Sequence, residues 1–160
     1  MKKRLLFTLL FTVSLMFAFT QSVTIEDNDR VGWSQGDVLA GANTTLGGTS
    51  IFNAEFSPEV GFALTDIDLV TLSVAYTNVD DVTAQRYQLG YQRSILCDGL
   101  YVGVGYGISK ANDETQSVFS SNIGYFKTVW DHLYISPRIG LSTSDGDVGI
   151  NTQLTFGFVL

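Results

Sequence analysis

The side chains that could perform chemistry are few in this chain of 160 residues, which holds one histidine, His132, and one cysteine, Cys97. A zinc site needs several clustered nitrogen or sulfur ligands, and a hydrolytic triad needs its histidine beside a serine in a shielded site. His132 follows Trp130 and Asp131 in a predicted turn, which suits neither. We therefore expect no enzymatic activity, no metal and no cofactor. Cys97 cannot form an internal disulfide, and we interpret it as a spare turn residue rather than a reactive thiol.

Two glutamates and two arginines are the other candidates: Glu55, Glu59, Arg86 and Arg138. Paired carboxylates could act as general acid and base, but neighbouring arginines keep carboxylates ionised, which does not suit that couple. Counted from the ends of the predicted strands, which are given below, Glu59 and Arg138 lie at a similar depth along their strands. Glu55 and Arg86 also lie at a similar depth. We predict the buried ion pairs Glu59–Arg138 and Glu55–Arg86, in one network with nearby amides. Such a network either gates an ion path or acts as a polar plug in place of a hydrophobic core, and we favour the plug.

The elements that must position these residues are recognisable by their alternating polarity. In the last thirteen residues, 148–160, one face carries mainly apolar residues and the other carries small or amide-bearing ones. A β-strand places successive side chains on opposite faces, so this segment is predicted to be a strand with one apolar side. The apolar face consists of Val148, Ile150, Thr152, Leu154, Phe156, Phe158 and Leu160.

Eight segments of this kind follow one another from residue 37 onward, separated by clusters of Asp, Asn and Gly that favour turns. No convincing apolar period of 3.6 residues, the mark of a helix, occurs after residue 22. The lengths suit strands that cross a membrane, which need about 9–11 residues. The predicted strands are 37–46, 51–63, 69–78, 84–95, 100–110, 116–128, 133–143 and 148–160.

The two faces of these strands differ in kind. Outward candidates are aliphatic or aromatic, for example Val60, Phe62, Leu72, Val74, Leu89, Val102, Val104, Tyr106, Ile108, Phe119, Ile123 and Leu141. Inward candidates are polar: Asn53, Glu55, Glu59, Thr71, Ser73, Arg86, Gln88, Gln92, Ser120, Asn122, Ser136, Arg138, Asn151 and Gln153. A soluble barrel would have the opposite arrangement. The sequence predicts an all-β fold, an eight-stranded antiparallel up-and-down transmembrane β-barrel with a polar, plugged interior.

Aromatic residues lie near the predicted strand ends, where the two membrane interfaces favour them. The candidates are Phe52, Tyr76, Tyr87, Tyr106, Trp130 and Phe158. Residues 21–36 are predicted to be a loose periplasmic lead-in to a barrel domain of residues 37–160, with Trp33 as a further interface anchor. Pro58 and Pro137 fall inside strands, where a proline lacks the N–H for the ladder. We predict a local β-bulge at each.

Residues 1–20 have the layout of a cleaved signal peptide: Lys2, Lys3 and Arg4 precede an apolar run that is short for a membrane-spanning helix. Cleavage after Thr20 or after Ser22 fits. Removing residues 1–20 takes away three of the 9 basic residues and none of the 16 acidic ones, so the net charge becomes −10. Nucleic-acid binders need a basic surface, so we expect no nucleic-acid partner.

Three stretches resemble the small porin-like outer-membrane β-barrels of the OmpA/OmpX type. They are 56–66 (FSPEVGFALTD), 101–107 (YVGVGYG) and 154–160 (LTFGFVL), and the resemblance extends over roughly residues 33–160. It implies a location in the outer membrane of a Gram-negative bacterium and insertion by the barrel-assembly machinery. The assembly signal would be Leu154, Phe156, Phe158 and Leu160, and it departs from the family pattern in ending on Leu rather than Phe.

The function predicted on these grounds is a structural or unassigned membrane role, without catalysis, for a monomer whose partners are outer-membrane lipid and lipopolysaccharide. A narrow passive pore for water or small ions is the first alternative, through rearranged pairs in the lumen. A soluble periplasmic barrel that binds an apolar ligand is the second.

Overall fold

The computed structural model describes residues 32–46, 56–79, 82–95, 99–111, 114–130, 132–144 and 147–160. The expectations for the signal peptide, for Phe52, Asn53 and Glu55, and for Cys97 lie outside these ranges. No helix in the described part of the chain is long and apolar enough to cross a membrane. The strands are β1 (Val38–Leu46), β2 (Phe56–Ala63), β3 (Asp68–Val79), β4 (Val82–Ser94), β5 (Leu100–Ala111), β6 (Glu114–Tyr125), β7 (Lys127–Trp130), β8 (Leu133–Ser144) and β9 (Asp147–Val159).

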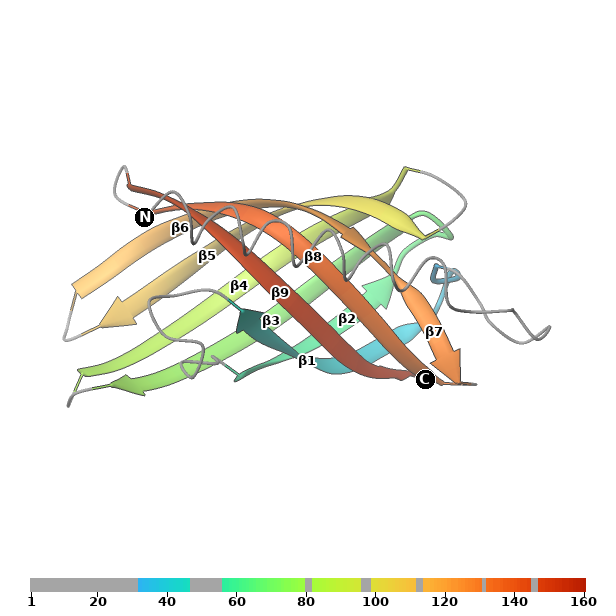
Figure 1. The fold of residues 1–160 in the computed structure, drawn as a ribbon, viewed down its shortest axis with the longest axis horizontal. Helices are drawn as coiled ribbons and strands as arrows, with labels where there is room; N and C mark the ends of the chain where they lie inside the picture. Colours follow the sequence, from blue (N-terminus) through green and yellow to red (C-terminus); the bar gives the residue numbers. More distant parts are fainter. Residues whose placement is uncertain are drawn as a thin grey trace.

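Every described strand pairs antiparallel with its neighbours, in the order β6-β5-β4-β3-β2-β1-β9-β8-β7, and an additional pairing of β6 with β8 closes the ring. Because β6 and β7 both pair with β8 and only Phe126 separates them, they act as one strand of the wall. The result is a closed eight-stranded antiparallel β-barrel with steeply tilted strands (Figure 1). The predicted eight-stranded antiparallel architecture is confirmed.

The closing contact joins the first strand to the last, from Leu39 opposite Val159 to Leu46 opposite Thr152. Gly41 faces Gly157 at the middle of this seam. A Cβ on Gly157 would collide with the backbone of β1, so this approach of the two strands requires glycine there. Closure pairs the edges of the sheet, which a barrel in lipid requires.

The two ends of the barrel differ in what they carry. At one end, here called the terminal end, β1 begins, β9 finishes, and β2 connects to β3, β4 to β5 and β7 to β8. The opposite end, here called the far end, carries the other four connections. In Figure 1 the terminal end lies on the right. An even number of strands brings the start of β1 and the end of β9 together at this end.

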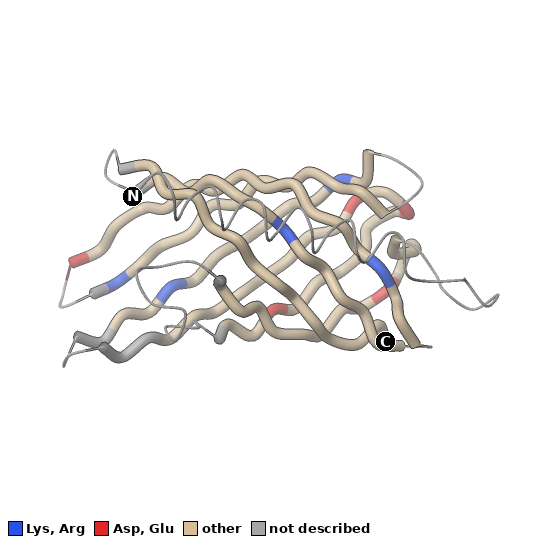
Figure 2. Tube along the Cα trace, in the orientation of Figure 1, with Lys and Arg blue, Asp and Glu red and all other residues tan. Residues whose placement is uncertain are grey.

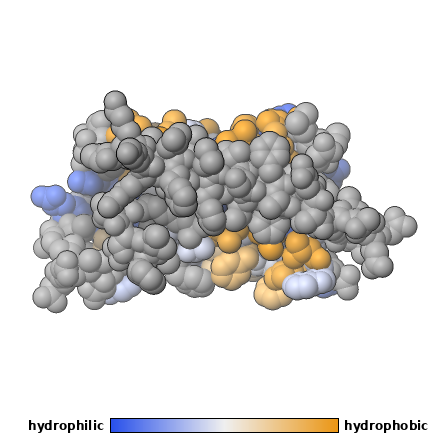
Figure 3. Space-filling view, in the orientation of Figure 1, coloured by the Kyte–Doolittle hydropathy of each residue, from blue (hydrophilic) through white to orange (hydrophobic). Residues whose placement is uncertain are grey.

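The outer wall is apolar over most of its height. Exposed large apolar residues include Val60, Phe62, Leu72, Tyr76, Leu89, Val104, Tyr106, Phe119, Leu141, Phe156 and Phe158. Lys and Arg, Asp and Glu take up little of the traced wall in Figure 2, and orange apolar surface is visible on the described wall in Figure 3. Buried polar residues face the other way: Asn43, Glu59, Thr71, Gln92, Ser136, Arg138 and Thr155. The predicted parity of the two faces is confirmed for the described residues.

Two local predictions are wrong. The predicted strand 116–128 is interrupted at Phe126, and a register irregularity follows between Thr128 and Trp130. The predicted bulges at the prolines are absent, because the β1–β2 ladder runs evenly through Pro58 and the β8–β9 ladder through Pro137. Each proline instead lies at a point where its strand is not paired with the neighbouring strand on its other side. The β2–β3 ladder ends at Glu59, and Pro137 lies between the residues of β8 that pair with β6 and with β7.

Candidate functional site in the barrel lumen

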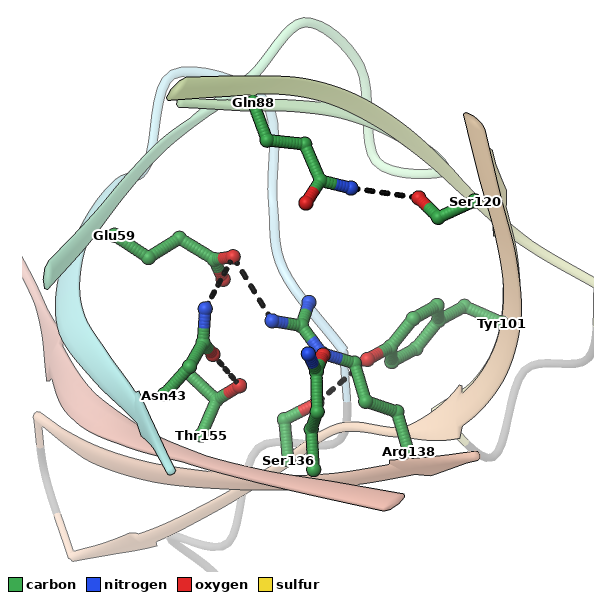
Figure 4. A network of polar contacts seen from close by, with 9 residues as sticks. Asn43, Glu59, Gln88, Tyr101, Ser120, Ser136, Arg138 and Thr155 are labelled. Carbon is green, nitrogen blue, oxygen red and sulfur yellow. Dashed lines mark hydrogen bonds and ion pairs between the residues drawn. The ribbon is translucent and has the colours of Figure 1, made fainter. Parts of the chain in front are cut away.

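An ion pair crosses the interior of the barrel from β2 to β8. Nη2 of Arg138 lies 3.0 Å from Oε2 of Glu59, with side-chain exposures of 7% and 10%. In Figure 4 the two side chains extend toward each other from separate parts of the wall. The structure thus brings together the two residues that were matched by depth in the sequence. Their opposite charges satisfy each other where an isolated charge would be costly.

Cross-strand neighbours hold this pair in place. Asn43 on β1 donates from Nδ2 to Oε2 of Glu59 at 2.9 Å, and it accepts a hydrogen bond from the hydroxyl of Thr155, which lies directly opposite on β9. Arg138 donates from Nε to Oε1 of Gln153 at 2.6 Å, and these residues also lie directly opposite each other, on β8 and β9. The register therefore places a hydrogen-bond partner beside each charge.

Between this pair and the far end, polar side chains surround a cavity of about 50 Å³. Gln88 on β4 donates to the hydroxyl of Ser120 on β6 at 2.6 Å, across β5 (Figure 4). The space comes from glycine on β5, because a Cβ at Gly105 would clash with both side chains. Arg86 also lines the cavity, and its Nε has no hydrogen-bond partner among the described residues. The predicted pair Glu55–Arg86 lies outside the described residues because Glu55 does.

Between the ion pair and the terminal end, aromatic rings fill the lumen. Phe126 stacks on Tyr134 with 4.9 Å between ring centroids, and the hydroxyl of Tyr101 lies 2.8 Å from Oγ of Ser136. Tyr101 fits because β6 has glycine opposite, and a Cβ at Gly124 would collide with the phenol ring. Sequence reasoning missed this cluster, although the parity of β5 and β8 turns Tyr101 and Tyr134 inward.

Trp33 completes the aromatic cluster, and the prediction that it anchors at the membrane interface is wrong. The side chain is 4% exposed and makes edge contacts with Tyr101 and Phe126 inside the barrel. No strand periodicity could have indicated that Trp33 points into the lumen, because Trp33 precedes the first strand.

The aromatic residues predicted to lie at the membrane interfaces are exposed on the outer wall: Tyr76, Tyr87, Tyr106, Trp130 and Phe158. Tyr106 packs against Phe119 with 5.0 Å between ring centroids. Leu160, Phe156 and Phe158 of the predicted assembly signal are exposed on the same wall, and Leu154 is half-buried.

The described residues hold no group of three or more His, Cys, Asp or Glu side chains that could bind a metal ion. His132 is exposed in the turn between β7 and β8. The chemistry that the described part of the lumen offers is therefore that of the Glu59–Arg138 ion pair and a set of amides and hydroxyls. These groups suit the binding of water or small ions and the stabilisation of the wall.

No family model and no curated protein sequence matches the chain. Among solved structures, the N-terminal β-barrel domain of Pseudomonas aeruginosa OprF is 15% identical, with a TM-score of 0.67 over 80% of this chain and 100% of that one. A de novo designed transmembrane β-barrel is 8% identical, with a TM-score of 0.54 over 81% of this chain and 99% of that one. Ail, the attachment invasion locus protein of Yersinia pestis, is 12% identical, with a TM-score of 0.45 over 79% and 99%.

At these identities the likeness concerns the fold alone. The OprF domain and the designed barrel share the closed antiparallel wall, and the exposed apolar belt around a polar lumen is what a barrel in lipid requires. The chain therefore has the fold of the small outer-membrane β-barrels of the OmpA/OmpX type.

Proposed function

We propose that this protein is an integral outer-membrane protein whose role is structural and whose barrel catalyses no reaction. The exposed apolar outer wall supports this most strongly, with side chains such as Leu72, Leu89 and Val104 each more than half exposed. Such a wall is unfavourable in water and favourable against acyl chains. Outer-membrane lipid and lipopolysaccharide are the partners that this wall would contact.

The alternative of a soluble periplasmic barrel with an apolar ligand finds no support in the interior. The cavity of about 50 Å³ in the lumen is lined by amides, hydroxyls and charged groups such as Glu59 and Arg138. An apolar ligand would strip these groups of hydrogen bonds, at about 1–3 kcal/mol for each group left unsatisfied.

Cell fractionation and gel migration test the proposal. The protein should sediment with outer membranes, need detergent for extraction, and migrate differently on gels before and after boiling, because a closed barrel resists unfolding by detergent. Recovery in the soluble periplasm without detergent, or migration that boiling does not change, would contradict it.

The last strand supports a proposal for assembly. Phe156, Phe158 and Leu160 form an exposed apolar row on β9 and just beyond it, and β9 closes the barrel against β1. We expect the barrel-assembly machinery to recognise this row. Replacing Phe158 with Ser should lower the amount of inserted protein, whereas replacing Phe119, which is equally exposed but lies on β6, should not.

A narrow pore is the second candidate, favoured by the polar cavity of about 50 Å³ between the Glu59–Arg138 pair and the far end. If the pair separates and the aromatic rings between it and the terminal end also move apart, water and small ions could pass along the lumen. Planar-bilayer recording separates the two roles. A sealed structural barrel should show no steady conductance, whereas a pore should show reproducible channels whose conductance changes in Arg138→Gln and much less in Arg93→Gln, an arginine at the outer terminal rim.

A further inference from the structure

The segment immediately before the first strand, residues 32–37 and here called the hook, folds back onto the terminal end of the barrel. The Gly36 N–H donates to the carbonyl of Ala63 at 2.9 Å, and the Gln35 N–H donates to Oδ1 of Asp66 at 2.8 Å. Gly36 adopts a φ of 91°, a left-handed conformation that favours glycine. The hook is thus a defined turn fastened to the connection between β2 and β3, rather than a loose lead-in.

The hook inserts Trp33 into the lumen. The indole lies 5.8 Å from the ring of Tyr101 and 5.6 Å from that of Phe126, centroid to centroid, with both contacts edge-to-face. Such contacts stabilise beyond the area that they bury. The space that the indole occupies is here called the seat. The remaining buried residues around it are Leu39, Ala63, Leu69, Tyr134 and Val159. These residues come from the wall on several sides, so the seat spans the interior of the barrel.

The interior is layered along the axis. The cavity of about 50 Å³ is lined at one limit by Glu59 and Arg138. A second cavity of only about 10 Å³ touches Glu59 on one side and Phe126 and Tyr134 on the other. The ion pair and the aromatic cluster are therefore separate barriers, and Trp33 belongs to the barrier nearer the terminal end.

We infer that Trp33 is a built-in plug, a side chain supplied by the hook that closes the terminal mouth of the lumen. Its ring is held by apolar contacts, because Nε1 of Trp33 has no hydrogen-bond partner among the described residues. The hook precedes the barrel ladders, which begin at Val38, so withdrawal of the plug breaks no strand pairing of the barrel wall. The vacated seat would accept a free aromatic molecule of the size of indole.

The plug can be tested by the access of a thiol reagent to the layer behind it. In a Cys97→Ser background, Ser136→Cys places a thiol among the residues of the second cavity, shielded from the far end by the Glu59–Arg138 pair. With Trp33 present, a charged methanethiosulfonate should label this thiol slowly. Adding Trp33→Ala should speed labelling by roughly tenfold or more, because reaction of a buried group follows the population of open states. Trp130→Ala, which removes the exposed tryptophan at the same end, should leave the rate unchanged.

The second part of the labelling test uses free indole. Added to the Trp33→Ala protein, indole should slow labelling back toward the parent rate, because an emptied apolar seat binds a matching ring. Equal labelling with and without Trp33 would overturn the inference. Fast labelling that indole fails to slow would overturn it too, since the mouth would then have opened through loss of structure. Boiling-dependent gel migration reports whether each variant is folded, and Trp33→Phe, which retains a ring, provides a milder variant with labelling close to the parent.

Fluorescence gives a reading that needs no cysteine. In Trp130→Phe the remaining barrel tryptophan is Trp33, and in Trp33→Phe it is Trp130, which is 74% exposed. Brominated lipid should quench Trp130 strongly and Trp33 weakly, and aqueous iodide should also quench Trp33 weakly. Strong quenching of Trp33 by either agent would place the ring outside the lumen and refute the plug.

Discussion

The two halves of the lumen are filled by opposite means. Toward the terminal end, four aromatic rings pack together and leave a cavity of only about 10 Å³: those of Trp33, Tyr101, Phe126 and Tyr134. Toward the far end, amides, hydroxyls and Arg86 surround a cavity of about 50 Å³. The Glu59–Arg138 pair lies between the two.

Different forces therefore stabilise the two halves. Aromatic rings gain from close contact and tolerate few gaps, so the terminal half resembles the core of a soluble protein. Polar side chains need partners in fixed directions, and the far half has room for roughly four water molecules at about 10–15 Å³ each. Substitutions should therefore be costly in the terminal half and at the ion pair, and tolerated in the far half.

The largest effect is expected where the two halves meet. Arg138→Met leaves Glu59 charged and buried without its partner, and it should lower the free energy of unfolding by about 3–5 kcal/mol. The double variant Glu59→Leu, Arg138→Met removes both charges and should recover most of that loss. Urea-induced unfolding in lipid vesicles measures both. A double variant that is no more stable than the single one would contradict this expectation.

Truncating a ring should cost nearly as much in the terminal half. Phe126→Ala empties space between Trp33 and Tyr134 and should lower the free energy of unfolding by about 3–4 kcal/mol. Val118→Ala, in a buried residue that already borders the larger cavity, is a smaller truncation in the far half and should cost markedly less for each carbon atom removed. Equal losses per carbon atom at the two positions would remove the contrast between the halves.

Substitutions that add volume should likewise cost more stability in the terminal half than in the far half. Gly124→Ala places a methyl group against the ring of Tyr101 and within 2.9 Å of Cβ of Arg138, so we expect a loss of about 2 kcal/mol. Gly149→Ala meets only Ser142, at an ordinary 3.5 Å, and should change stability by less than about 0.5 kcal/mol. The same unfolding measurement compares them, and a tolerated Gly124→Ala would indicate that the aromatic layer can shift.

The smallest effect belongs to a single polar contact of the far half. Gln88→Ala removes the 2.6 Å hydrogen bond to Ser120 and should cost about 1 kcal/mol, because neighbouring water can replace the lost partner. A double-mutant cycle with Ser120→Ala isolates the contact, and a coupling of about 0.5–1 kcal/mol is expected. A much larger coupling would mean that the far half is drier than its cavity suggests.

Much of the fold could be predicted because strand alternation is a local signal. The predicted strand 37–46 corresponds to β1 (Val38–Leu46), and 84–95 corresponds to β4 (Val82–Ser94), within one or two residues at each end. The matched depths of Glu59 and Arg138 could be counted along their strands, since each residue of a barrel strand advances the chain by a fixed rise. The same counting could not show that Asn43 and Thr155 lie beside this pair, because that depends on the register of the closing seam.

The class of the protein can be read from the sequence alone: the number of strands, the apolar outer face, and the charges that must point inward. How the lumen is closed depends instead on packing between distant parts of the chain. The hook lacks a periodic pattern, so nothing local to Trp33 distinguishes an anchor on the outer wall from a ring inside it. The choice follows from where the rings of Tyr101 and Phe126 converge, and both residues lie far from Trp33 along the chain. Periodicity encodes which way a side chain points, whereas packing depends on which other side chains meet it there.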